Sequence, residues 1–485
     1  MEDRLLRRRA FFIGGEWIAA AGGERFMVVS PSSEEVIGEV PLATSVDIDR
    51  AVEAARKAFD QGPWPRMTAG ERADVLARAA EELRKRAPDI AAVTLEEMGC
   101  PVSQAARSQT GLVAPVFDYY AQLIRGFELE RKVVVGERAG LVVQLPIGVV
   151  GAIVAWNAPV LLAAWKVAPA LAAGCTVVIK PPPEAPLSNF VFAEALQAAG
   201  VPDGVISVVP GGREVGQHLV QHPGVDKIAF TGSTEAGKRI MAVCAEQVKR
   251  VSLELGGKSA AIVLDDADMA TVIPNVVRGA LHLSGQFCGA QTRILVPRAR
   301  YAELVDAAAS VAASAVVGDP HDPKTTVGPL VAERQRSRVE GLIAQAVEQG
   351  ARVVTGGKRP AHLDKGWYVQ PTVLADVDNA MTIAQEEVFG PVLCLIPHDG
   401  DDDAVRIANT SRYGLAGGVW SGDDRRAFEV ARRLRTGSVT VNGTPAPFPH
   451  VPFGGLKESG LGRELGPEGL RGYLEPKSMG LPPKL

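Results

Sequence analysis

Three residues stand in settings that could support the chemistry of an acyl group. Cys288 lies in GQFCGAQ, where the small residues that follow leave space beside a sulfur that is nucleophilic as a thiolate. A free cysteine is also a common small hydrophobic residue of protein cores. Glu254, between two leucines in LELGG, could be a general base with a raised pKa, or a capping or ion-paired carboxylate. Asn157, in AWNAP, could donate to an oxyanion or close the turn before a proline.

A second set of residues is typical of a nucleotide site. The segment KIAFTGSTEAGKRI predicts a strand, a turn at Gly232 and a helix whose N-terminus would face a phosphate. The spacing Gly232-x4-Gly237 differs from G-x-G-x-x-G, so the glycines could instead allow tight packing between strand and helix. Lys180 ends the strand CTVVIK, at the edge where open parallel sheets bind nucleotides, although a lysine there is often a solvated charge.

Short apolar runs indicate the framework that positions these residues. A first series, separated by helix-compatible segments, occupies residues 148–156, 175–180, 204–212 and 227–233. A second series occupies residues 259–264, 293–296, 351–357, 392–396 and 437–443. Because strands that alternate with helices form parallel, doubly wound sheets, the sequence predicts two α/β domains, the second beginning near residue 257.

The N-terminal region predicts amphipathic helices, and one later segment predicts a loop. Apolar residues of 47–60 recur on one helical face, and Thr68-x-x-Glu71 is a capping box before a second helix. The Pro- and Gly-rich segment 445–455 must be a loop, and loops of that kind often line sites.

The composition is that of an ordinary globular protein and excludes several classes. Hydrophobic residues make up 46% of the 485 residues and charged residues 22%, unlike disordered, collagen-like or coiled-coil chains. The 52 basic and 56 acidic residues give a net charge of −4 without a long basic run, so no nucleic-acid partner is expected.

The sequence predicts a cytoplasmic protein with no membrane partner. The first residues include arginines but lack the apolar core of a signal peptide, and the longest apolar stretch, 149–162, is interrupted and too short to cross a bilayer. The five cysteines are far apart and form no CxxC pair, which argues against a disulfide framework and against a zinc site. No metal is therefore expected.

The motifs together carry more information than any one of them. Asn157, Lys180, GSTEAG, LELGGK and GQFC are followed by EEVFGPV (386–392) and PFGGLKESGLGRE (452–464). In this order and approximate spacing they resemble the NAD(P)-dependent aldehyde dehydrogenase superfamily, and the resemblance extends from FIGGEW to YLEPKS. It implies an aldehyde dehydrogenase-like α/β fold with two doubly wound Rossmann-like domains and a small β-strand oligomerisation extension.

The resemblance implies oxidation of an aldehyde to a carboxylic acid through a thiohemiacetal and a thioester on Cys288. The side chain of Asn157 and the backbone N–H of Cys288 would hold the oxyanion, and a hydride would pass to the nicotinamide. Glu254 would deprotonate the water that hydrolyses the thioester. Lys166 and Glu464 match positions that assist proton movement in the family.

The implied cofactor is NAD, with NADP possible. Many NAD-specific members carry a glutamate where this chain has Pro183, and a carboxylate there would repel a 2′-phosphate. The neighbouring Glu184 could partly substitute for it. The residues expected to contact the cofactor are Ile153, Trp156, Lys180, Gly212, Phe230, Gly232, Ser233, Leu255, Glu387 and Phe389.

The expected substrate is a small-molecule aldehyde with a hydrophobic or aromatic body. Ala158 stands where relatives often carry Phe, whereas Trp165 and Phe287 add aromatic surface nearby. A further departure is Leu283, which stands where many members have Asn five positions before the thiol. The residues expected to line the substrate site are Ala158, Trp165, Phe287, Phe448 and Phe453.

The resemblance also implies domain limits and a homodimer or homotetramer. Glu475 is expected to pair with Arg250 and Arg463 at a subunit interface. The expected parts are a coenzyme-binding domain at 1–123 and 147–256, a catalytic domain at 257–454, and oligomerisation or bridging segments at 124–146 and 455–485.

Two alternatives to this function stay open from the sequence. A CoA-acylating semialdehyde dehydrogenase would pass the acyl group to CoA, but retention of Glu254 favours water as the acceptor. A structural or binding homologue would keep the fold without catalysis, but Cys288, Glu254 and Asn157 are all present.

Overall fold

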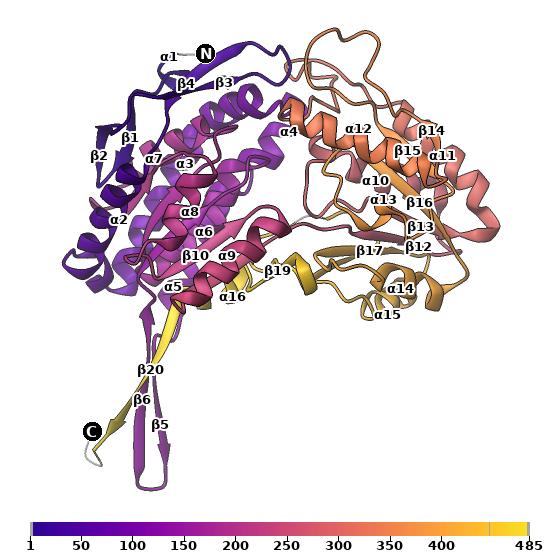
Figure 1. Ribbon diagram of the computed structural model, residues 1–485. Helices are drawn as coiled ribbons and strands as arrows, with labels where there is room; N and C mark the ends of the chain where they lie inside the picture. Colours follow the sequence, from indigo (N-terminus) through magenta and orange to yellow (C-terminus); the bar gives the residue numbers. More distant parts are fainter. Residues whose placement is uncertain (1–2, 446, 483–485) are drawn as a thin grey trace.

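The chain forms two α/β halves around separate sheets, and a narrow arm projects from the first half (Figure 1). The computed structural model describes residues 3–445 and 447–482. This arrangement confirms the predicted fold of two doubly wound units with a strand extension.

The first sheet has eight strands in the order β19-β11-β10-β7-β8-β9-β1-β2. Neighbours from β11 to β9 pair in parallel, whereas β19, β1 and β2 pair antiparallel at the two ends. Its strands are β1 (Ala10–Ile13), β2 (Glu16–Ala19), β7 (Val149–Ile153), β8 (Thr176–Lys180), β9 (Ile206–Val208), β10 (Lys227–Thr231), β11 (Arg250–Glu254) and β19 (Gly460–Leu461).

Helices cover both faces of this sheet, which explains why its central strands are continuous apolar runs. Every residue of β7, β8 and β10 is buried, and so is every residue of the covering helix α6. The helices of this half are α1 (Asp3–Leu6), α2 (Ser45–Asp60), α3 (Ala69–Met98), α4 (Val102–Ala105), α5 (Val113–Gly126), α6 (Pro159–Ala173), α7 (Leu187–Ala198), α8 (Arg213–Gln221), α9 (Thr234–Glu246) and α16 (Gly466–Arg471).

The predicted capping box is present at the start of α3. The Thr68 hydroxyl accepts from the Glu71 N–H at 3.2 Å, and the Glu71 carboxylate accepts from the Thr68 N–H at 2.7 Å. Between α4 and α5 the chain makes one π-helical turn, η2 (Ala106–Thr110), which shifts the register of the following residues. A small two-stranded sheet of β3 (Arg25–Val29) and β4 (Val36–Pro41) packs near the N-terminus.

The second half is built on a seven-stranded sheet with the order β14-β15-β16-β13-β12-β17-β18, parallel except for β14. Its strands are β12 (Ala260–Val263), β13 (Arg293–Pro297), β14 (Arg352–Thr355), β15 (Thr372–Ala375), β16 (Val392–His398), β17 (Ala416–Trp420) and β18 (Ser438–Val441). Its helices are α10 (Met269–Ala280), α11 (Tyr301–Ala313), α12 (Glu333–Glu348), α13 (Thr382–Gln385), α14 (Asp401–Asn409) and α15 (Asp424–Ala431).

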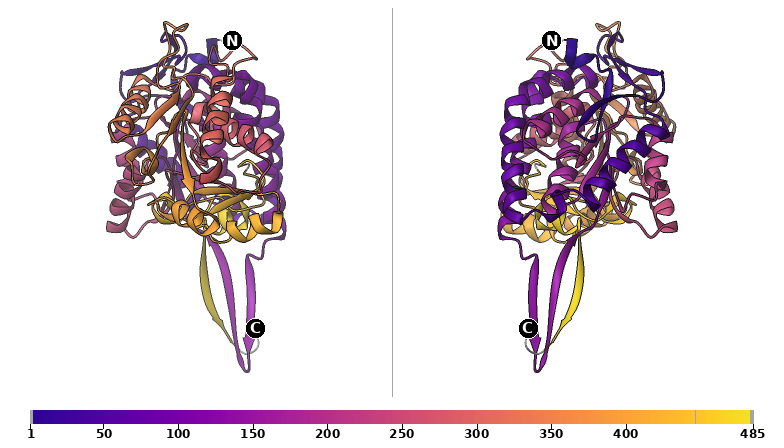
Figure 2. Two further views of the ribbon diagram at one scale, coloured as in Figure 1. Left: turned by 90° about the vertical axis from the view of Figure 1, so that its right-hand side faces the viewer. Right: turned by 90° about the vertical axis from the view of Figure 1, so that its left-hand side faces the viewer.

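The arm is a three-stranded antiparallel sheet of β5 (Glu130–Val135), β6 (Arg138–Pro146) and β20 (Leu474–Leu481) (Figure 2). All six residues of β5 are exposed. Of the predicted segment 455–485, β20 projects with the arm, whereas β19 pairs with β11 in the first sheet and α16 packs against α6.

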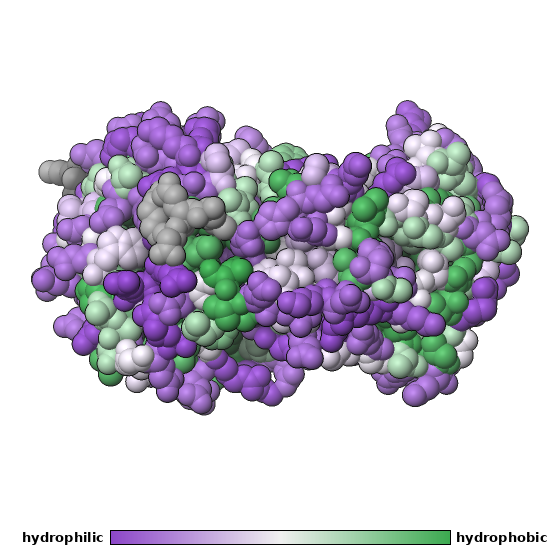
Figure 3. All heavy atoms as spheres, turned by 90° about the horizontal axis from the view of Figure 1, so that it is seen from above, coloured by the Kyte–Doolittle hydropathy of each residue, from purple (hydrophilic) through white to green (hydrophobic). Residues whose placement is uncertain are grey.

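The face of the molecule seen from above is mostly hydrophilic, with apolar residues in smaller patches (Figure 3). Within 3–445 and 447–482, no helix combines the length and hydrophobicity needed to cross a membrane. The same residues contain no group of three or more His, Cys, Asp or Glu side chains arranged to hold a metal ion.

Candidate active site

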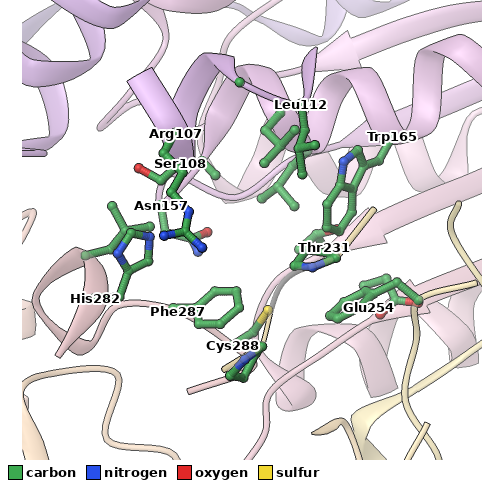
Figure 4. A pocket seen from close by; sticks show the side chains of 18 of the residues that line it. Arg107, Ser108, Leu112, Asn157, Trp165, Thr231, Glu254, His282, Phe287 and Cys288 are labelled. Atoms are coloured by element: carbon green, nitrogen blue, oxygen red, sulfur yellow. The ribbon is translucent and has the colours of Figure 1, made fainter. Parts of the chain in front are cut away.

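A cavity of about 550 Å³ lies where the two halves meet, and it contains most of the predicted chemistry. The sulfur of Cys288 points into the space between Phe287 and Glu254 (Figure 4). The predicted residues that line the cavity are Cys288, Glu254, Asn157, Glu464, Leu255, Ala158, Trp165, Phe287 and Phe453. Phe448 lies on the surface instead, with its ring 6.2 Å from that of His450.

Cys288 is the partly buried cysteine of the chain, and the other four are buried. The pKa of its thiol is raised to about 12, mainly by burial and also by the nearby carboxylates of Glu387 and Glu254, which repel a thiolate. The sulfur is therefore neutral at rest, and a nucleophilic role requires removal of its proton.

The turn before Cys288 has an unusual backbone. Leu283 and Ser284 both adopt left-handed conformations, with φ of 50° and 58°, which costs an L residue about 1–2 kcal/mol. Gly285 continues the turn at φ 74°, and a Cβ there would lie 2.1 Å from the carbonyl oxygen of Gly390. The turn is therefore pressed against a loop of the second half.

Glu254 ends β11 and is buried. Among the described residues, its Oε2 atom has no hydrogen-bond partner. Burial raises the pKa of Glu254 well above its usual range, and repulsion from Glu464 adds to this, whereas Lys166 and Arg463 act in the opposite direction. A carboxylate whose pKa is raised in this way is a stronger base than an ordinary glutamate.

A buried ion pair lies beside Glu254. The Lys166 ammonium, on α6, donates to the Glu464 carboxylate at 2.5 Å and also to the Thr231 hydroxyl. Glu464 and Thr231 line the cavity, whereas Lys166 lies behind them with no exposed side-chain surface. The pair places a second carboxyl group, that of Glu464, next to Glu254.

Asn157 lies in the turn between β7 and α6, and both its side-chain amide and its backbone carbonyl have hydrogen-bond partners. Its side-chain Nδ2 donates to the carbonyl of Gln286 at 3.0 Å, and its backbone carbonyl accepts from Gln109 Nε2 at 3.1 Å. The side chain is thus fixed against the segment that carries Cys288, and a primary amide has a second N–H to offer a substrate oxygen.

Aromatic and aliphatic side chains form much of the cavity wall. The rings of Trp165 and Phe453 lie 5.4 Å apart, and that of Phe287 lies 6.4 Å from His282. The pKa of His282 is lowered to about 4, mainly by burial and also by the charge of Arg107, so this imidazole is neutral. The cavity is also lined by Leu283 and by Pro445 and Pro447 of the predicted 445–455 loop. Lining residues absent from the prediction are Arg107, Ser108, Gly111, Leu112, Leu161, Leu162, Thr231, Asn275, Arg278, Gly279, His282 and Thr444.

The predicted cofactor residues of the first half gather at the carboxyl edge of its sheet. Lys180, at the end of β8, donates to the carbonyl of Gly211 at 2.6 Å, and burial lowers its pKa to about 8. Ser233 caps α9 by accepting from the Ala236 N–H at 3.3 Å. At the same edge lie Ile153 at the end of β7, Phe230 in β10, Gly232 after it, Leu255 after β11, and Gly212 at the start of α8.

Two predicted cofactor residues reach this edge from the second half. The Glu387 carboxylate accepts from the Gly257 N–H at 3.0 Å, and burial raises its pKa to about 7. The Phe389 ring meets that of Trp156 edge to face, with centroids 5.2 Å apart. The two halves therefore meet along the strip between the sheet edge and Cys288.

The fold and the cavity define a two-domain α/β enzyme with a thiol, a buried carboxylate and an amide around one reaction space. Residues 17–479 match the model of the aldehyde dehydrogenase family. The chain belongs to this family, and it is an oxidoreductase that acts on aldehydes.

Relatives and solved structures agree over almost the whole chain. Geranial dehydrogenase of Castellaniella defragrans is 46% identical over 469 residues, which are 96% of this chain and 98% of that protein. A Mycobacterium tuberculosis aldehyde dehydrogenase complexed with NAD+ superposes with a TM-score of 0.97 at 46% identity, covering 99% of both chains. A Pseudomonas syringae aldehyde dehydrogenase C mutant complexed with NAD+ and octanal gives a TM-score of 0.94 at 42% identity, covering 97% and 96%.

Proposed function

We propose that the protein oxidises hydrophobic aldehydes to carboxylic acids with NAD+, through a thioester on Cys288. The observation that carries this proposal is that Cys288 and Glu254 line one cavity whose other walls are largely apolar. A sulfur nucleophile and a buried base on either side of the same space can form and then hydrolyse an acyl group.

The apolar wall supports the substrate class. Leu112, Leu161 and Leu162 line the cavity together with Trp165 and Phe453. Such a surface gains free energy by excluding water from an aliphatic or aromatic chain. The names of two similar proteins point the same way, since one is a geranial dehydrogenase and another binds octanal.

In the first stage, the Cys288 thiol gives its proton to solvent water, and the resulting thiolate adds to the carbonyl carbon of the aldehyde and forms a thiohemiacetal. The free N–H of the Asn157 amide is placed to donate to the oxygen that becomes negative. Loss of hydride from the same carbon leaves the thioester on Cys288. When bound, NAD+ supplies the acceptor for that hydride.

In the second stage, Glu254 takes a proton from a water that attacks the thioester carbon, and the Cys288 thiolate leaves as the carboxylic acid forms. The Lys166–Glu464 pair lies close enough to Glu254 to act on its pKa, and it is suited to receive the proton from Glu254. This role for the pair is part of the proposal.

The residues at the sheet edge fit a dinucleotide. The first turn of α9 and the Ser233 cap suit a pyrophosphate, and we expect the Lys180 ammonium to donate to a ribose hydroxyl. A Cβ at Gly212 would meet no atom within 4 Å, so the backbone there is open to a ligand. Glu387 and Phe389 would contact the nicotinamide half, and NADP remains a second cofactor to be tested.

We extend the proposal to assembly. The exposed strand β5 and the arm around it would pair with a second copy, giving a cytoplasmic homodimer or homotetramer. The predicted domain limits belong to the same proposal.

The experiment is a panel of aldehydes assayed for NADH release with and without CoA. Release without CoA, together with formation of the carboxylic acid, would support the proposal. Release that requires CoA would instead indicate acyl transfer to CoA, and no release with any aldehyde would indicate a homologue without catalysis.

A further inference from the structure

Two arginines mark the solvent end of the substrate cavity. Arg107 and Arg278 both line the cavity and are exposed, whereas Glu254 and Asn157 are buried and Cys288 is partly buried. In Figure 4, Arg107 and His282 lie together on the side away from Glu254. The cavity therefore runs from the thiol to a pair of guanidinium groups.

The two arginines come from two different elements, the π-helical turn η2 and the helix α10. Arg107 lies in the π-helical turn η2, and Ser108, Gly111 and Leu112 of the same region line the cavity with it. Turns of this kind occur frequently at functional sites. Arg278 lies on α10 three residues after Asn275, so the two share one helical face, and both line the cavity.

The positive charge of these arginines is not neutralised by the protein. Within the described parts of the chain, neither guanidinium has an ion pair or a hydrogen bond. By contrast, Arg84 pairs with Asp118 and Arg125 with Asp74 on the neighbouring helices α3 and α5. An unpaired pair of cations at the mouth of an apolar cavity is therefore a local feature of this site.

The acidic groups of the cavity lie at its other end. Glu254 and Glu464 are buried, and Lys166 pairs with the second of them. The neutral imidazole of His282 adds no positive charge at the mouth. An elongated ligand consequently meets apolar walls along its length and two cations at its far end.

We propose that Arg107 and Arg278 are specificity-determining residues that select aldehydes with a carboxylate at the far end of an apolar chain. The inference rests on the proposed function and narrows its substrate class to oxo acids of medium length. The apolar wall holds the methylene or ring segment, the aldehyde carbon lies at Cys288, and the guanidinium N–H groups donate hydrogen bonds to the carboxylate.

The test compares two substrates of equal length, nonanal and 9-oxononanoate, by their kcat/KM with saturating NAD+. The wild-type enzyme is expected to prefer the oxo acid about fivefold or more at low ionic strength, since charge-assisted hydrogen bonds strengthen binding. This preference should fall as salt is raised, because the arginines are exposed.

Substitutions test whether the preference for the oxo acid depends on these two arginines. Arg107→Gln and Arg278→Gln should each lower the ratio of the two kcat/KM values about threefold to tenfold, mainly through the KM for the oxo acid. The lysine variants Arg107→Lys and Arg278→Lys should restore part of the ratio. Arg425→Gln is the matched control, because Arg425 is an exposed arginine on α15 outside the cavity, and its ratio should equal that of the wild type.

Three results would overturn the inference. Equal kcat/KM values for nonanal and 9-oxononanoate in the wild type would show that the two arginines do not select for a substrate carboxylate. The proposed aldehyde oxidation would be unaffected by that result. An unchanged ratio in both glutamine variants would remove the two arginines from specificity. Failure to oxidise either substrate, or any member of the panel, would remove the proposed function itself.

Discussion

The guanidinium of Arg334 lies 2.6 Å from the carboxylate of Glu184 and thereby links the two halves of the molecule. Arg334 lies on α12 of the second half, and Glu184 follows the end of β8, where Lys180 lies. The negative charge of Glu184 is thus already compensated. It is a poor substitute for a free carboxylate at the preceding position, which is Pro183.

This pair leads to a prediction about cofactor choice. NAD+ should be the main oxidant, with detectable use of NADP+. Position 183 is a proline, so it carries no carboxylate that would repel a 2′-phosphate. Pro183→Glu should lower kcat/KM for NADP+ about fivefold to tenfold while affecting NAD+ less. Steady-state kinetics with both cofactors is the measurement, and equal losses with the two would show that this strand end does not read the 2′ position.

The thiol of Cys288 should be indispensable. Cys288→Ala is expected to lower oxidation of every aldehyde by at least about 1000-fold, because no covalent intermediate can form. Cofactor binding, followed by fluorescence, should persist. Cys244→Ala, which changes a buried cysteine of α9 away from the cavity, is the control and should retain turnover. Substantial activity in Cys288→Ala would end the thiol mechanism.

Glu254 should act after the thioester has formed. Glu254→Gln removes the base but keeps a similar shape, so acylation should survive and deacylation should slow by about 100-fold or more. Rapid mixing should then show a burst of about one NADH per active site followed by slow turnover. A steady-state rate like that of the wild type would exclude Glu254 from this role.

The pH dependence of turnover should report on Glu464. A base works in its ionised form, so the raised pKa of Glu254 means that kcat falls as the pH is lowered through that pKa. Glu464→Gln removes a repelling charge and should lower the pKa of Glu254, which moves the acid limb of the kcat profile to lower pH. Lys166→Met removes an attracting charge and should move the limb to higher pH, so shifts in the same direction would contradict this account.

The base of the arm should communicate with the active site. Glu475, in β20, pairs with Arg250 in β11, the strand that ends at Glu254, whereas Arg463 donates instead to the carbonyls of Gly455 and Gly462. Among the described contacts, Glu475 therefore pairs with Arg250 and does not pair with Arg463. Glu475→Lys should place two cations together and disturb β11.

The expected result for Glu475→Lys is a rise of about threefold to tenfold in the Kd for NAD+, together with lower activity and altered oligomeric mass. Binding titration and light scattering are the measurements. Wild-type values for both would leave the pair as an ordinary surface contact, whose contribution to stability is about 0–1 kcal/mol.

Local signatures explain what could be predicted from the sequence. Buried parallel strands are continuous apolar runs, so both sheets were accessible, and Cys288, Glu254 and Asn157 stand in short motifs at strand or turn ends. Arg107 and Ser108 gave no such signal, because the polar residues of 106–110 resemble an exposed helix. The π-helical turn and the approach of the second half bring them to the cavity.

For other residues the sequence pattern fitted two different structural positions equally well. Leu161 and Leu162 lie in a uniformly apolar helix, where a cavity wall and a core position look alike. Phe448 was expected in the wall because of its ring, but the course of the loop leaves it on the surface. Tertiary packing decided each case.

The left-handed turn at Leu283 and Ser284 has a consequence for how the enzyme fails. A free peptide of this sequence would not choose that shape, so the position of Cys288 is imposed by the packing of Gly285 against Gly390. We therefore expect heating, or a distant substitution that loosens this contact, to release the turn before either sheet unfolds. The thiol of Cys288 should then lose its alignment early, so that loss of activity precedes loss of the folded structure.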